Sequence, residues 1–248
     1  MRVKTDNNFG GYVMIGIIGA MDIEVDGLIN ELEGMIESYH IAGRDFTKGV
    51  LENSDVVIVK CGVGKVNAAC ATQAMIDRFK VDAIINTGVA GSLDNNIDIA
   101  DIVVSGDVVQ HDMDITALGY PKGKIPETTS ISFKADRKLI DIAINSAKKT
   151  LTGVNVFEGR VASGDEFINS DEKKNQIVEE FNATCCEMEG GAIAQVCELN
   201  SVPFVVIRAI SDKADGSSHM DYPVFERKAA DNSIKLINGI IDEITEIY

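Results

Sequence analysis

Residues 56–85 read VVIVKCGVGKVNAACATQAMIDRFKVDAII, and this stretch decides the fold class. It holds a short apolar run at 56–59, an alanine-rich segment of helical character at 66–79, and a second apolar run at 83–85. Runs that are apolar at consecutive positions are typical of strands covered on both faces. A strand, a helix and a strand in this order predict a parallel sheet flanked by helices.

The same alternation continues on both sides of this stretch. Further apolar runs lie at 13–18, 102–104 and 203–207, and helical periodicity marks 23–32, 140–147 and 234–244. No repeat or low-complexity linker divides the chain of 248 residues. We therefore predict a single α/β domain with a mixed, mostly parallel, twisted central sheet flanked by helices. The domain is expected to span 14–248, and residues 1–13 are expected to form a poorly ordered N-terminal extension.

Composition excludes several classes of partner. The formal net charge of −16 argues against nucleic acid, because phosphate backbones are held by clustered Lys and Arg. No apolar run reaches the roughly 18 residues that a membrane span needs, and the polar N-terminal segment lacks the apolar region of a signal peptide. The five cysteines form no C-x-x-C pair, as expected in a reducing compartment. We therefore expect a cytoplasmic protein that does not bind membranes.

Three short motifs suggest cofactor or metal sites, but each is incomplete. Gly16 lies inside a strand-like run and Gly19 follows it, but the G-x-G-x-x-G dinucleotide fingerprint is absent. Gly64 and Lys65 resemble the end of a P-loop, but Val66 stands where Ser or Thr should bind magnesium. The segment 111–114 holds a His and two Asp, yet consecutive strand residues point to opposite faces, so a turn is expected there. No cofactor and no metal are expected.

Carboxylates follow several of the predicted strands. Glu24 follows the first strand, Glu187 and Glu189 lie where a strand gives way to a helix, and Asp212 ends the strand that contains Arg208. Taken singly, each could be a helix cap. Ligands of open α/β sheets bind beyond the carboxyl ends of strands, so together these groups are expected to converge on one cleft. An acid, a base and a group that holds sugar hydroxyls suit hydrolysis at a sugar carbon.

Seven segments in order closely resemble the methylthioadenosine/S-adenosylhomocysteine nucleosidases, within the nucleoside phosphorylase superfamily. They are residues 15–25, 62–67, 84–91, 111–120, 163–168, 187–190 and 202–212. The resemblance extends from Met14 to the C-terminus. It implies hydrolysis of the N-glycosidic bond of 5′-methylthioadenosine and S-adenosylhomocysteine, which releases adenine and a 5-thio-substituted ribose.

The resemblance also implies roles for individual residues. Glu24 would be the general base that polarises water, and Asp212, oriented by Ser211, would protonate N7 of adenine. The ribose and purine contacts would come from Glu189, Met188, Phe167 and the backbone of Ile168. The rest of the substrate-binding set would be Ala20, Met21, Val63, Val89, Ala90, Gly91, Glu187, Arg208 and Tyr222.

A lid from a neighbouring subunit would cover the 5′-substituent, which implies a homodimer. The matching residues are Ile115, Leu118, Tyr120 and Pro126. Three positions differ from common family members: Val89 replaces Ser, Tyr222 replaces Phe, and Leu118 replaces an aromatic residue. These differences bear on affinity and on the preferred 5′-group.

Other functions remain open at this stage. A purine nucleoside phosphorylase would need arginines or similar donors for phosphate near the glycine turns, and residues 19–21 and 89–91 carry no basic side chain. A hydrolase of another 5′-substituted adenosine, such as 5′-deoxyadenosine or aminodeoxyfutalosine, is a second alternative. A non-catalytic nucleoside-binding protein on the same scaffold would need neither Glu24 nor Asp212.

Overall fold

The computed structural model describes residues 14–247, and the predicted N-terminal extension lies outside them. The described strands are β1 (Met14–Gly19), β2 (Glu33–Ile41), β3 (Arg44–Leu51), β4 (Ser54–Lys60), β5 (Ala83–Ser92), β6 (Ile102–Gln110), β7 (Ser132–Lys134), β8 (Val156–Ser163), β9 (Cys185–Glu187) and β10 (Phe204–Asp212). The α-helices are α1 (Asp22–Asn30), α2 (Lys65–Phe79), α3 (Arg137–Thr150), α4 (Asp171–Phe181), α5 (Gly190–Asn200) and α6 (Ser218–Ile247), and Thr116–Leu118 forms a 3₁₀ turn.

All described strands belong to one mixed sheet, ordered β10-β6-β8-β9-β5-β1-β4-β3-β2, with β7 on β6. The βαβ unit predicted from residues 56–85 is present: β4 and β5 both pair in parallel with β1, which lies between them. β5 also pairs with β10, so β10, β6, β8, β9 and β5 form a closed ring of strands. This ring brings strand ends that are far apart in the sequence to one place.

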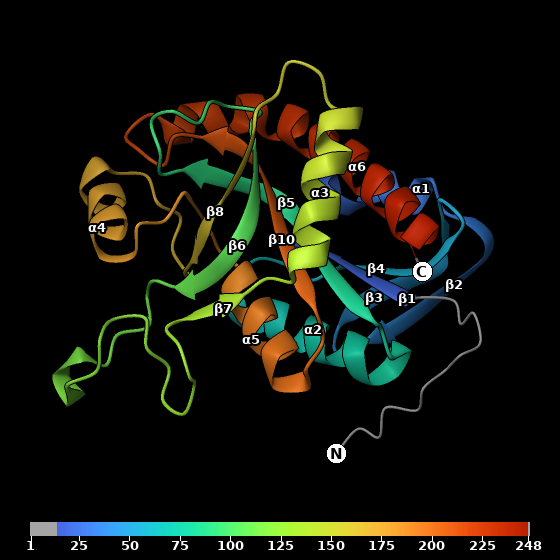
Figure 1. Cartoon of the computed structure of the whole chain (residues 1–248), viewed down its shortest axis with the longest axis horizontal. Helices are drawn as coiled ribbons and strands as arrows, with labels where there is room; N and C mark the ends of the chain where they lie inside the picture. The colour runs from blue at the N-terminus through green and yellow to red at the C-terminus, as the bar shows by residue number, and fades with distance from the viewer. Residues whose placement is uncertain (1–13, 248) are drawn as a thin grey trace.

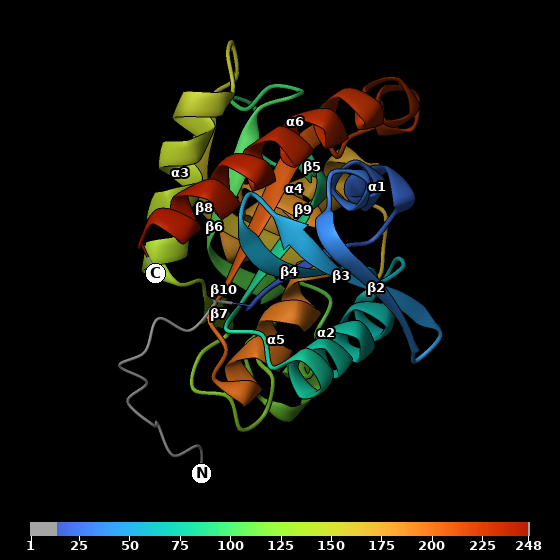
Figure 2. The same cartoon turned by 90° about the vertical axis from the view of Figure 1, so that its right-hand side faces the viewer.

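Helices cover both faces of the sheet (Figures 1 and 2): α1, α3 and α6 lie on one side, and α2 and α5 on the other. The strand residues divide accordingly, since Val56 and Ile58 join the core beneath the first group and Val57 and Val59 join the core beneath the second. Because both faces are buried, a strand such as β4 can be apolar at successive positions. No helix within residues 14–247 is long and apolar enough to cross a membrane.

The predicted single α/β domain with a mixed central sheet is confirmed. Each predicted strand and helix overlaps an observed element, although the predicted ranges 23–32 and 203–207 extend two residues beyond the end of α1 and one residue before the start of β10. The antiparallel hairpin of β2 and β3 was not predicted. Its outer strand, β2, is largely exposed, so it lacks the apolar run that marks the inner strands. The hairpin lies at the sheet edge, away from the closed ring.

Candidate active site

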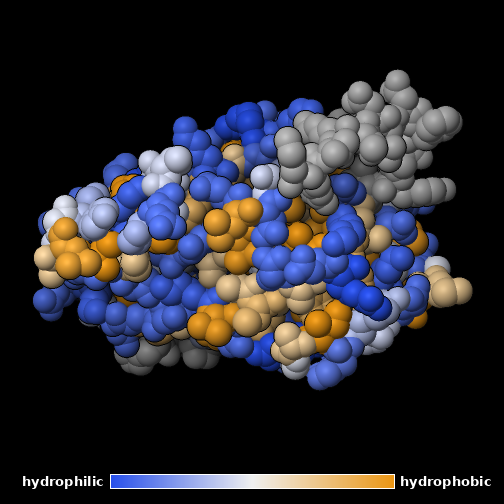
Figure 3. Space-filling view, turned by 90° about the horizontal axis from the view of Figure 1, so that it is seen from below, coloured by the Kyte–Doolittle hydropathy of each residue, from blue (hydrophilic) through white to orange (hydrophobic). Residues whose placement is uncertain are grey.

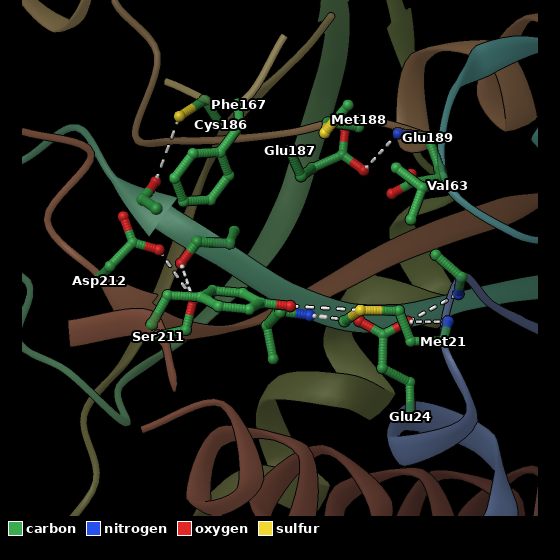
Figure 4. A pocket seen from close by; sticks show the side chains of 15 residues that line it. Met21, Glu24, Val63, Phe167, Cys186, Glu187, Met188, Glu189, Ser211 and Asp212 are labelled. Carbon is green, nitrogen blue, oxygen red and sulfur yellow. Dashed lines mark hydrogen bonds between the residues drawn. The ribbon is translucent and has the colours of Figure 1, made fainter. Parts of the chain in front are cut away.

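One cleft at the carboxyl ends of the strands collects the predicted carboxylates (Figure 4). Glu24 comes from the first turn of α1, Glu189 precedes α5, and Asp212 is the last residue of β10. The cleft is lined by Ala20, Met21, Glu24, Val63, Val89, Ala90, Gly91, Phe167, Cys186, Glu187, Met188, Glu189, Ser211, Asp212 and Tyr222. Fourteen of these fifteen residues were predicted, and Cys186 was missed because a Cys in an apolar run gives no signal of its own.

Glu24 is held by backbone N–H groups from two elements. Its Oε2 accepts hydrogen bonds from the N–H groups of Ala20 (2.7 Å) and Met21 (3.0 Å), and its Oε1 accepts one from Val89 of β5 (3.0 Å). The side chain is 3% exposed. Burial raises the pKa of the Glu24 carboxyl above its usual value, although Arg208 and the three N–H groups act in the opposite direction. Glu24 therefore caps its own helix and also faces the cleft.

Asp212 lies at the other end of the cleft, beside Ser211 (Figure 4). Its Oδ1 accepts a hydrogen bond from Ala214 N–H, and its Oδ2 accepts one from the Ser211 hydroxyl, both at 2.9 Å. Gly91 of β5 leaves room for this carboxylate, because a Cβ at that position would lie 2.9 Å from Asp212 Oδ1. Asp212 is thus 2% exposed overall and has a fixed orientation.

Glu187 and Glu189 lie on either side of Met188 but have different surroundings. Glu187 Oε2 accepts hydrogen bonds from the N–H groups of Glu189 (3.0 Å) and Gly190 (2.7 Å), so Glu187 caps α5. It also forms a buried ion pair with Arg208. Burial alone would raise the pKa of Glu187, but Arg208 and the hydrogen bonds hold it below the usual value. Of the two glutamates, Glu187 is therefore the one that stays ionised, in its ion pair with Arg208.

Glu189 accepts a hydrogen bond from the N–H of Gly64, at 2.8 Å, in the turn that precedes α2. Burial, followed by the negative charge of Glu187, raises the pKa of Glu189 to about 8. A carboxyl that is readily protonated at neutral pH can both donate and accept hydrogen bonds, as a pair of sugar hydroxyls requires. Burial is thus the main cause of the raised pKa of Glu189, and the negative charge of Glu187 adds to it.

Apolar and aromatic side chains form the walls. The rings of Phe167 and Tyr222 meet edge to face with centroids 5.8 Å apart, and the Tyr222 hydroxyl lies 3.2 Å from Met21 Sδ. A smaller chamber beside Asp212 is lined in part by Ile168, Phe167 and Glu166. A flat aromatic group fits such walls.

Six predicted residues do not line the main cleft, and one of them, Ile168, lines the smaller chamber beside Asp212. Arg208 lies buried behind the main cleft. Ile115, Leu118, Tyr120 and Pro126 belong to the segment after β6, which projects from the body of the molecule (Figure 1). Leu118 is 74% exposed. Within residues 14–247, no group of three or more His, Cys, Asp or Glu side chains is placed to hold a metal ion.

The family model of the phosphorylase superfamily matches residues 14–242. The chain is 42% identical to a 5′-methylthioadenosine/S-adenosylhomocysteine nucleosidase of Staphylococcus aureus, over 93% of this chain and 100% of the relative. The chain therefore belongs to the phosphorylase superfamily and, within it, to the methylthioadenosine/S-adenosylhomocysteine nucleosidases. It is an N-glycosidic hydrolase.

Two solved structures are similar over nearly their whole length. The first is the Neisseria meningitidis 5′-methylthioadenosine/S-adenosylhomocysteine nucleosidase in complex with methylthio-immucillin-A, which has a TM-score of 0.89 and 36% identity and covers 93% of this chain and 99% of its own. The second is the futalosine hydrolase of Helicobacter pylori, also with a TM-score of 0.89 and 36% identity, which covers 94% of this chain and 98% of its own.

Proposed function

We propose that the chain hydrolyses the N-glycosidic bond of 5′-methylthioadenosine and S-adenosylhomocysteine and releases adenine. One observation carries this proposal: four buried carboxylates, Glu24, Glu187, Glu189 and Asp212, line a cleft whose lining, among the described residues, contains no Lys or Arg. Carboxylates stabilise the positive charge that develops on ribose in an oxocarbenium-like transition state. The identity to nucleosidases over nearly the whole chain supports the same reaction.

In the proposed reaction, water attacks C1′ while the bond from C1′ to N9 breaks. Glu24 takes a proton from the water, and Asp212 gives its proton to N7, so that adenine leaves as a neutral base. Adenine is a poor leaving group as an anion, and one well-placed acid contributes roughly 10²- to 10⁴-fold. A proton then returns from Glu24 to Asp212 through solvent, which restores both groups.

The proposed contacts with the ribose, the purine and the 5′-group follow from the positions of the side chains that line the cleft. Glu189, with Met188 beside it, would hold the ribose hydroxyls. Phe167 would stack on the purine, and the backbone of Ile168 would contact its edge. The uncharged 5′-thioether would then lie against the apolar side chain of Val63.

A phosphorylase is disfavoured by the charges around the cleft. Phosphate needs several fixed donors, usually including Arg or Lys. Lys65 is close to the glycine turn, but its Nζ is paired with Asp112 at 2.7 Å and also lies 3.3 Å from Gln110 Oε1. The lysine is therefore already engaged in the protein.

The similarity to futalosine hydrolase favours one second candidate, a hydrolase of aminodeoxyfutalosine. Both candidates share the ribose and purine contacts and differ in the 5′-group. Initial rates with 5′-methylthioadenosine, S-adenosylhomocysteine, 5′-deoxyadenosine and aminodeoxyfutalosine separate them. We expect the highest kcat/KM with the first two, and turnover of aminodeoxyfutalosine alone would overturn the proposal.

We further propose a homodimer in the cytoplasm. The lid residues Leu118 and Tyr120 are exposed and apolar, as are Val63 beside the cleft and Val66 on α2. Figure 3 shows hydrophobic side chains gathered on the face on which α2 and α5 lie. A second copy that covers this face would bring its own lid residues to the cleft. Five free thiols, one of them exposed, support a reducing compartment.

A further inference from the structure

Asn86 is a buried polar residue in the middle of β5, outside the lining of the cleft. Its Nδ2 donates a hydrogen bond to the carbonyl of Ile18 at the end of β1, at 2.8 Å. Its Oδ1 accepts a hydrogen bond from Nη2 of Arg208 on β10, at 2.6 Å. At Asn86, β5 lies between β1 and β10. The side-chain amide connects these two strands, because its N–H donates toward β1 and its oxygen accepts from β10.

Arg208 is 1% exposed, and its charge acts on several groups at once. Its Nη2 also donates to Glu187, and its Nη1 donates to the Ile207 carbonyl at 3.0 Å. Among the described residues, no hydrogen-bond partner lies near its Nε. The hydrogen bonds that orient the guanidinium therefore come from Asn86, Glu187 and one carbonyl.

The titratable groups around this guanidinium come from four places in the fold. They are Glu24 of α1, Cys185 and Glu187 of β9, Glu189 at the start of α5, and Cys61 after β4. One cation thus faces three carboxylates, and among the described residues only Glu187 forms an ion pair with it. The position of the guanidinium decides how its charge is shared between Glu24 and Glu189, because electrostatic attraction in a buried site falls with distance.

We propose that Asn86 is a positioning residue that holds Arg208 on Glu187 and so sets the protonation of Glu24 and Glu189, two of the carboxylates that face the substrate. The inference rests on the proposed function, in which Glu24 and Glu189 act on water and ribose. Without the amide, the guanidinium loses one of its two side-chain acceptors and can move within the carboxylate cluster. A displacement of this kind near reacting groups costs about 10- to 100-fold in rate.

Two substitutions separate positioning from simple support of the fold. Asn86→Leu removes both hydrogen bonds at similar volume. Asn86→Asp keeps an acceptor for Arg208 but adds a fourth carboxylate to the cluster, and an added negative charge raises the pKa of neighbouring carboxyls. The matched control is Thr87→Val, because Thr87 is the next residue of the same strand and is buried, and its Oγ1 has no hydrogen-bond partner among the described residues.

The experiment measures kcat and KM for 5′-methylthioadenosine from pH 5 to about 9, with thermal unfolding as the check of folding. We expect Asn86→Leu to lose about 10-fold or more in kcat/KM. For Asn86→Asp we expect the acid limb of the profile to move up by roughly half a pH unit or more, with part of the rate recovered above it. Thr87→Val should keep the wild-type rate and profile.

Each outcome decides the proposal. Folded Asn86 variants with wild-type kcat/KM and an unmoved profile would overturn it, whatever their unfolding temperatures, because a merely structural residue changes stability alone. If Asn86→Leu does not fold, the profile of Asn86→Asp decides. If the wild-type chain itself releases no adenine, the proposed function fails, and that result is distinguishable because it precedes any variant.

Discussion

Replacing Asp212 by Asn should separate catalysis from stability, because the structure lets Asn make the same number of hydrogen bonds. The Asn Oδ1 can accept from Ala214 N–H, as Asp212 Oδ1 does at 2.9 Å. Its Nδ2 can donate to the Ser211 Oγ, whose proton can turn to the Ala90 carbonyl, now 3.3 Å away. With no buried polar group left unpaired, the free energy of unfolding should change by no more than about 1 kcal/mol.

The same substitution removes the proton that the proposed reaction gives to N7. Loss of a general acid costs roughly 10²- to 10⁴-fold in kcat, or about 2.7 to 5.4 kcal/mol of barrier. The affinity for 5′-methylthioadenosine should be nearly unchanged, because Asn is the same size as Asp. We therefore expect an inactive protein that still binds the nucleoside.

The assay combines adenine release, followed by chromatography, with equilibrium binding of 5′-methylthioadenosine and urea unfolding. The control is Asp98→Asn, which makes the same chemical change at a side chain that is 79% exposed and paired with Lys213 outside the cleft. That variant should keep the wild-type rate, since exposed ion pairs contribute little. Full activity in Asp212→Asn would refute the assignment of the acid.

Three further predictions test the electrostatics, the packing and the assembly. Burial and Glu187 raise the pKa of Glu189 to about 8, so its contribution to stability is complete below the usual pKa of Glu and is lost as the pH rises to about 8. Glu189→Gln should therefore flatten the fall of Tm with pH across that range, and an unchanged slope of Tm against pH would contradict this. Gly164→Ala should cost about 1–3 kcal/mol of unfolding free energy, because its Cβ would lie 2.3 Å from His111 Nε2. Gly216→Ala should change little, because among the described residues no atom lies within 4 Å of the new Cβ; equal urea midpoints for the two variants would count against this packing. Leu118→Asp should weaken the proposed dimer and raise KM for 5′-methylthioadenosine, and sedimentation that shows a dimer of unchanged stability would argue against this lid.

The inner sheet and its helices could be predicted because burial on both faces leaves a clear mark on the sequence. Runs such as the one in β4 are apolar at successive positions. The β2–β3 hairpin could not be predicted, because the exposed strand β2 has mixed polar and apolar residues and its sequence resembles that of a loop. The closure of the ring through β5 and β10 depends on pairing between residues more than 100 positions apart, which local periodicity does not encode.

The carboxylates of the site could be predicted from their places after strands, but their surroundings could not. The positions of Glu187 and Glu189 after a strand do not distinguish these two residues, and only the family resemblance assigns the ribose contact to Glu189. In the structure Glu187 caps α5 and pairs with Arg208, whereas Glu189 faces the cleft with a raised pKa. That difference arises from the register of β9 against β8 and from the position of β10 in the sheet. Both are features of the tertiary structure that local sequence patterns do not encode. The contact between Asn86 and Arg208 could not be predicted either, because it also depends on how the strands pair.

The central claim is that water, not phosphate, attacks the ribose. The most direct measurement follows the products formed from 5′-methylthioadenosine with and without added inorganic phosphate. We predict adenine and free methylthioribose at the same rate in both conditions. A sugar 1-phosphate that forms only when phosphate is present would contradict the account and make the chain a phosphorylase.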